Sequence, residues 1–163
     1  MSSYSRRLLL AAGLALLAGC GFAPVYGPGG SGTALMGRVE VTEPDTRAGF
    51  LLTRELEGRL GRASGARYEL RPRIALATEA IAIDRTNISS RFNMLGRVHY
   101  ALLDRQTGAS VTTGMVENFT AFSAAGSPVA TQAAERDAEQ RLMTILADQL
   151  VTRLIATTPD LAQ

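Results

Sequence analysis

The 163-residue chain has little of the chemistry on which most metal and catalytic sites depend. It contains one cysteine, Cys20, and one histidine, His99. A single cysteine cannot form an internal disulfide, and without a second histidine the usual zinc sites and Cys–His catalytic pairs are excluded. The glycine cluster at residues 27–32 precedes no strand-loop-helix unit, so it is not a phosphate-binding loop. We therefore expect neither enzymatic activity nor a metal, and we interpret His99 as an ordinary strand residue.

Lysine is missing altogether, so all 17 basic residues are arginine. Two of them, Arg6 and Arg7, precede residue 20, which leaves the rest of the chain with 15 basic and 15 acidic residues and no formal net charge. This balance gives no support to nucleic-acid binding. Arginine suits bidentate binding of phosphate or carboxylate, but a compositional bias of the genome explains the same enrichment.

Long hydrophobic runs are also missing. The run from Leu8 to Ala18 has 11 residues without a polar side chain. As a helix it would cover roughly 17 Å, well short of the ~30 Å hydrocarbon core of a bilayer. Nothing after Cys20 approaches 18 consecutive apolar residues. The sequence therefore predicts no transmembrane helix.

The first 20 residues instead have the pattern of an export signal. Two arginines, an apolar segment and small residues before a possible cut site are typical of a cleaved signal peptide. The order Leu17-Ala18-Gly19-Cys20 resembles the bacterial lipobox, in which the cysteine sulfur carries a diacylglycerol. We predict a signal peptide at residues 1–19 and a diacylglycerol and an acyl chain on Cys20, which together anchor the mature protein. The alternative is an ordinary signal peptide beside an accidental cysteine.

Glycine and proline are frequent directly after Cys20, and we predict a lipidated tether at residues 20–35. Alternation with a period of two predicts strands near residues 36–41, 68–83, 92–102 and 110–119. Apolar residues spaced three and four apart predict helices near residues 46–60 and 127–156. Residues 158–163 are expected to be a disordered tail. Residues 36–157 would then form one domain.

The predicted order is β-α-β-β-β-α. It indicates an α+β fold in which a four-stranded sheet, mixed or antiparallel, has two helices packed on one face. Pro72 lacks an N–H, which places its strand near a margin of the sheet. The other face of the sheet would be open, and odd-numbered arginines point toward it. The candidates for phosphate contacts on this face are Arg71, Arg73, Arg91 and Arg97.

Several segments of the chain resemble the lipopolysaccharide-assembly lipoprotein LptE family. They are the residues from Cys20 to Gly27, the order of the elements, and the blocks at residues 134–142 and 146–150. The residue after the cysteine, Gly21, is similar to the pattern of lipoproteins that are exported to the outer membrane.

The resemblance implies an outer-membrane lipoprotein on the periplasmic side. Such a protein sits as a plug in the large β-barrel LptD and helps lipopolysaccharide reach the outer leaflet. No local motif transfers lipid-contacting residues of the family to positions in this chain. The alternative is an auxiliary lipoprotein of another lipid-trafficking transporter of the envelope.

Overall fold

The structure is a computed structural model that describes residues 27, 30–83, 89–124 and 127–158. The predicted signal peptide, Cys20 and residues 159–163 of the predicted tail lie outside the described residues. The tail prediction is wrong for Thr158, which is buried and whose hydroxyl donates to the Leu154 carbonyl at 2.6 Å. Within the described part of the chain, no helix is long and apolar enough to cross a membrane.

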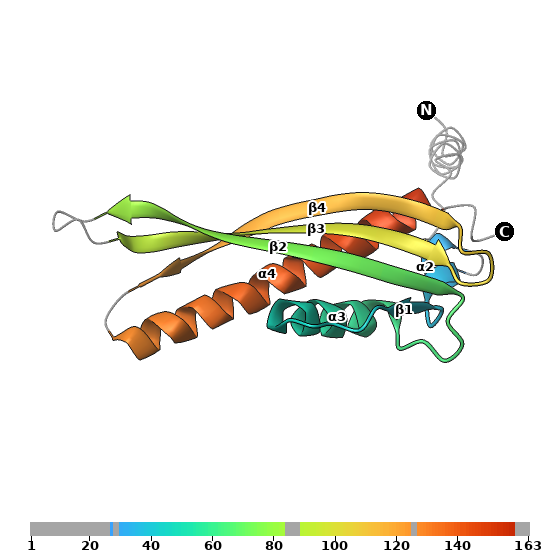
Figure 1. Ribbon diagram of the computed structural model, residues 1–163, viewed down its shortest axis with the longest axis horizontal. Helices are drawn as coiled ribbons and strands as arrows, with labels where there is room; N and C mark the ends of the chain where they lie inside the picture. Colours follow the sequence, from blue (N-terminus) through green and yellow to red (C-terminus); the bar gives the residue numbers. More distant parts are fainter. Residues whose placement is uncertain (1–26, 28–29, 84–88, 125–126, 159–163) are drawn as a thin grey trace, which may run out of the picture.

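A mixed four-stranded sheet forms the centre of the fold, and its strands follow one another in the order of the chain. Strand β1 is parallel to β2, and the pairs β2–β3 and β3–β4 are antiparallel. Figure 1 shows helices α3 and α4 on the same side of this sheet. The α+β prediction is confirmed, including its mixed form. The described elements are α2 (Ser31–Leu35), β1 (Val39–Val41), α3 (Arg47–Leu60), β2 (Tyr68–Ile83), β3 (Ser89–Asp104), β4 (Ser110–Ser123) and α4 (Pro128–Thr157).

Local chemistry sets the ends of the two long helices. The Thr46 hydroxyl accepts a hydrogen bond of 3.1 Å from the Gly49 N–H and caps α3. Gly61 follows α3 with a φ of +75°, a conformation in which glycine has no steric penalty. Ser127 caps α4 through the Ala130 N–H at 3.3 Å, and Pro128 occupies the first helical position. Both helices therefore begin and end close to their predicted limits.

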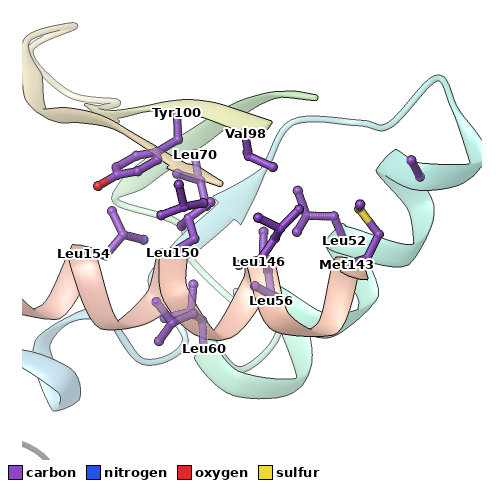
Figure 2. Packing of buried hydrophobic residues seen from close by; sticks show 14 of the residues in the cluster. Leu52, Leu56, Leu60, Leu70, Val98, Tyr100, Met143, Leu146, Leu150 and Leu154 are labelled. Carbon is purple, nitrogen blue, oxygen red and sulfur yellow. The ribbon is translucent and has the colours of Figure 1, made fainter. Parts of the chain in front are cut away.

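The core lies between the helices and the sheet, and leucine dominates it. Figure 2 shows side chains of α3 and α4 facing those of the strands. Helix α4 packs against α3 as well as against β3 and β4. Burial of these side chains is the main source of stability, because each fully buried leucine contributes about 1.5–3 kcal/mol. The fully buried leucines are Leu35, Leu52, Leu56, Leu70, Leu102, Leu142, Leu146, Leu150 and Leu154.

The tether prediction is wrong for the residues directly before β1. Residues 31–35 form helix α2, and Leu35 is completely buried. The Gly37 N–H donates to the Leu60 carbonyl at 2.7 Å, which joins this segment to the end of α3. The packed domain thus begins before residue 36, and the element order gains a helix at its start. The sequence did not predict helix α2, because this glycine-rich segment contains a single leucine and therefore no periodic apolar pattern.

Strand β2 is longer than its neighbour β1, and this leaves most of one edge unpaired. Strand β1 ends at Val41, which lies opposite Leu70. Beyond that point β2 is bonded to β3 alone among the described strands. Pro72 therefore lies on a free edge, as its missing N–H predicts.

Candidate functional site

The face of the sheet that lies opposite α3 and α4 is the candidate functional site, and we call it the open face (Figure 1). Even-numbered residues of β3, such as Val98 and Leu102, point into the core and are fully buried. Because side chains alternate along a strand, the odd-numbered residues point away from the helices. The register aligns odd residues of β2, β3 and β4 in rows, for example Arg73, His99 and Met115.

All four candidate arginines are exposed at odd positions, as predicted, but they do not form one cluster. Arg71 and Arg73 lie two residues apart on β2, and Arg97 lies opposite Ala75 in the next row. Arg91 is six residues from Arg97 along β3, which corresponds to roughly 20 Å. The structure therefore brings three of the arginines together and leaves Arg91 at the far end of the sheet.

Two of these arginines already have acidic partners. Arg71 donates two hydrogen bonds of 2.9 Å to the Glu69 carboxylate, and they lower the pKa of Glu69 and raise that of Arg71. Arg97 donates to the Glu117 carboxylate, its neighbour across the sheet, at 2.9 Å. Both pairs are more than half exposed on the arginine side, so they contribute little to stability. Among the described residues, Arg73 has no carboxylate within ion-pair distance.

The open face is hollowed in two adjoining places. The first hollow has a volume of about 630 Å³ and is lined by Arg71, Arg73 and His99 together with Met115. The second has a volume of about 690 Å³, and most of its lining is apolar. Ala75, Ala77, Leu95 and Phe119 line this second hollow. Arg97 and Glu117 lie at its border with the first hollow, and Glu79 lines its opposite end. The open face thus has a cationic half and an apolar half.

The apolar half was missed in the sequence analysis, where the outward face of each strand was interpreted as polar. Phe119 of this half is 58% exposed, and Met115, which lines the cationic half, is 39% exposed. A signal was present, because Leu95, Met115 and Phe119 break the alternation with large apolar side chains at outward positions. Exposed apolar side chains that lie next to one another mark binding surfaces more often than isolated ones do.

His99 lies on the open face between Arg73 and Met115 and is exposed. In the described ranges, no group of three or more His, Cys, Asp or Glu side chains is placed to hold a metal ion. What the arrangement can do chemically is bind: arginines can hold phosphate oxygens, and the apolar half can cover hydrocarbon.

The fold and the open face together define a small α+β domain that offers a cationic and apolar sheet surface to a ligand. A family model described as "LptE: Lipopolysaccharide-assembly" matches residues 36–154. The chain belongs to this lipopolysaccharide-assembly family, and the resemblance seen in the sequence is confirmed. No curated protein sequence matches the chain.

Solved structures with the same fold come from several bacteria. A putative lipoprotein from Caulobacter crescentus CB15 is 26% identical, with a TM-score of 0.67 over 77% of this chain and 93% of that one. The rare lipoprotein B from Shewanella oneidensis is 12% identical, with a TM-score of 0.60 over 77% of this chain and 98% of that one. An uncharacterized lipoprotein B from Nitrosomonas europaea is 15% identical, with a TM-score of 0.56 over 74% of this chain and 83% of that one. At 12% and 15% identity, the last two show a common fold alone.

Proposed function

We propose that this chain is a lipoprotein of the outer membrane that binds the β-barrel LptD and assists lipopolysaccharide transport to the outer leaflet. It has no enzymatic activity in this role. Diacylglycerol and an acyl chain on Cys20 hold it on the periplasmic side, since two or more chains anchor a protein stably. The folded domain then works within reach of the membrane surface.

The observation that carries this proposal is an open arginine-bearing sheet face in a chain of the lipopolysaccharide-assembly family. Lipid A carries phosphates, and a guanidinium group matches two phosphate oxygens at once. Arg73 is the first candidate, because it lines the first hollow and has no carboxylate within ion-pair distance among the described residues. Arg71 and Arg97 are further candidates, which would have to exchange Glu69 and Glu117 for the phosphate. Arg91 lies too far along β3 to contact the same phosphate, and it is the weakest of the four candidates.

The first test identifies the partner. The full chain is expressed with a C-terminal tag, the native envelope is extracted with mild detergent, and the bound proteins are identified by mass spectrometry. We expect one large outer-membrane β-barrel in an equimolar amount. A Cys20→Ser variant serves as the control for lipidation, because we expect mass spectrometry to find the added mass of a diacylglycerol and an acyl chain on Cys20 of the unchanged chain and none on the variant.

Two results would contradict the proposal. Recovery of inner-membrane transporter subunits in place of a barrel would favour an auxiliary lipoprotein of another lipid transporter. Absence of the mass of a diacylglycerol and an acyl chain from the N-terminal peptide of the unchanged chain would show that Cys20 does not carry the anchor.

A further inference from the structure

We propose that the apolar half of the open face is an acyl-chain groove for the same lipid whose phosphates the arginines bind. This inference rests on the proposed function, because the lipid is lipopolysaccharide. It adds a binding site for hydrocarbon, formed by Ala75, Ala77, Leu95 and Phe119.

The register shows that this groove is continuous. Ala77 of β2 lies opposite Leu95 of β3, which in turn lies opposite Phe119 of β4. These three side chains form one apolar row across the sheet. The row with Arg97 and Glu117 comes next, and the row with Arg73 and His99 follows it. From Leu95 to His99 the separation is four residues, or roughly 13 Å along the strand.

The small side chains make the groove and the large ones border it. The small side chains of Ala75 and Ala77 line the groove on β2, and the exposed ring of Phe119 borders it on β4. A solvent-exposed phenyl ring gains free energy when hydrocarbon covers it, at about 25 cal/mol per Å² of apolar surface removed from water. A flexible acyl chain can lie along such a groove and remove these apolar side chains from contact with water.

The charge distribution decides which kind of ligand fits. Arg97 is paired with Glu117 between the two halves, so an anion gains little at this point. Arg73 has no carboxylate partner among the described residues, and His99 adjoins it, so the anionic end of a ligand is favoured in the first hollow. Inorganic phosphate would use only the cationic half, and an apolar segment of a protein would use only the apolar half. A phosphorylated lipid with an acyl chain uses both.

The test measures binding of the full-length chain, purified in detergent, to two probes. One is intact lipopolysaccharide and the other is lipopolysaccharide from which all acyl chains have been removed by alkaline hydrolysis. We expect Phe119→Ser to weaken binding of the intact lipid about tenfold and to leave binding of the deacylated probe unchanged. We expect Arg73→Glu to weaken binding of both probes, because it removes a phosphate contact.

Phe50→Ser is the matched control, because Phe50 is 61% exposed on α3, away from the open face. It should bind both probes like the unchanged chain.

Three outcomes would overturn the proposal or part of it. If Phe119→Ser binds intact lipopolysaccharide normally while Arg73→Glu does not, the groove is wrong and the arginine site stands. If Phe119→Ser loses only the β-barrel partner, the apolar half docks a protein and the groove is again wrong. If the unchanged chain binds neither probe, the lipid-binding part of the proposed function fails as well.

Discussion

A single glycine, Gly96, determines how closely α4 approaches the sheet. A Cβ atom added at this position would lie 2.8 Å from Leu146 Cδ1 and 2.9 Å from Leu142 Cδ2. Both leucines are completely buried, so neither side chain has free space into which it can turn. The glycine thus has a packing role rather than a conformational one.

We expect Gly96→Val to lower the free energy of unfolding by about 1–3 kcal/mol, because the added methyl groups overpack the contact with α4. Chemical denaturation measures this difference. The control is Gly58→Ala on α3, where nothing lies within 4 Å of the added Cβ. That change should leave stability the same or raise it by up to about 1 kcal/mol, since alanine favours a helix. Equal stability of Gly96→Val and the unchanged chain would contradict the packing role.

Asp104 holds the turn between β3 and β4. Its carboxylate accepts hydrogen bonds from the Gln106 N–H at 2.8 Å and the Thr107 N–H at 3.2 Å, and Arg67 lies 3.3 Å away. The Gln106 N–H is the largest cause of a lowered pKa for Asp104, and the Thr107 N–H and Arg67 act in the same direction. The ionised form is therefore the one that stabilises the folded chain.

This pKa shift has a consequence for stability at low pH. A carboxylate whose pKa is lower in the folded state stabilises fully above its unfolded pKa of about 3.9, and this stabilisation is lost as the pH falls through the folded value. We expect Asp104→Asn to lower the melting temperature at pH 7 and to differ less from the unchanged chain at pH 3. Thr107→Ala, which keeps the carboxylate, should show a difference that is the same at both pH values. A constant difference for Asp104→Asn would contradict this role.

At the scale of elements, helix α2 contributes to the stability of the core although it has only five residues. Leu35 extends the core beyond β1, and the adjacent Met36 is 46% exposed. We expect Leu35→Ala to cost about 2–5 kcal/mol, because it leaves a cavity in a closely packed core. Met36→Ala should change stability by no more than about 0.5 kcal/mol. If both variants unfold like the unchanged chain in urea, residues 31–35 are a tether after all.

Helix α4 shows how far a periodic pattern predicts burial. The stripe expected from its spacing consists of Ala138, Leu142, Ile145, Leu146, Leu150 and Leu154, and all of these are buried except Ile145, which is half-buried. Met143, Ala147 and Val151 are buried too, because α4 packs against α3 on a second side. How many elements pack against a helix depends on the tertiary structure. A single apolar stripe in the sequence therefore predicts a narrower buried face than the helix has.

For the whole molecule, the arrangement of layers decides where a ligand can bind. Both long helices cover the same face of the sheet, and no described helix covers the other face over β2, β3 and β4 (Figure 1). On that free face the register joins residues that are far apart in the chain, such as Ala77 and Phe119. The phosphate contacts and the acyl-chain groove proposed above are therefore properties of the sheet rather than of any one strand.

The sequence alone determined the features that depend on neighbours in the chain. Periods of two and of 3.6 residues predicted the strands and the two long helices, and the structure shows Thr46, Gly61 and Ser127 at the limits of those helices. The exposure of the four arginines also followed from alternation. These are local effects of side-chain direction and hydrogen bonding, and a sequence displays them directly.

Only the tertiary structure decided which of these elements meet. Strand order, the parallel pairing of β1 and the burial of Leu35 all depend on contacts between distant segments. The same is true of the site, because the register brings Arg71, Arg73 and Arg97 together and leaves Arg91 apart. The apolar row from β2 to β4 exists only once three strands are aligned, since each strand contributes a single side chain to it.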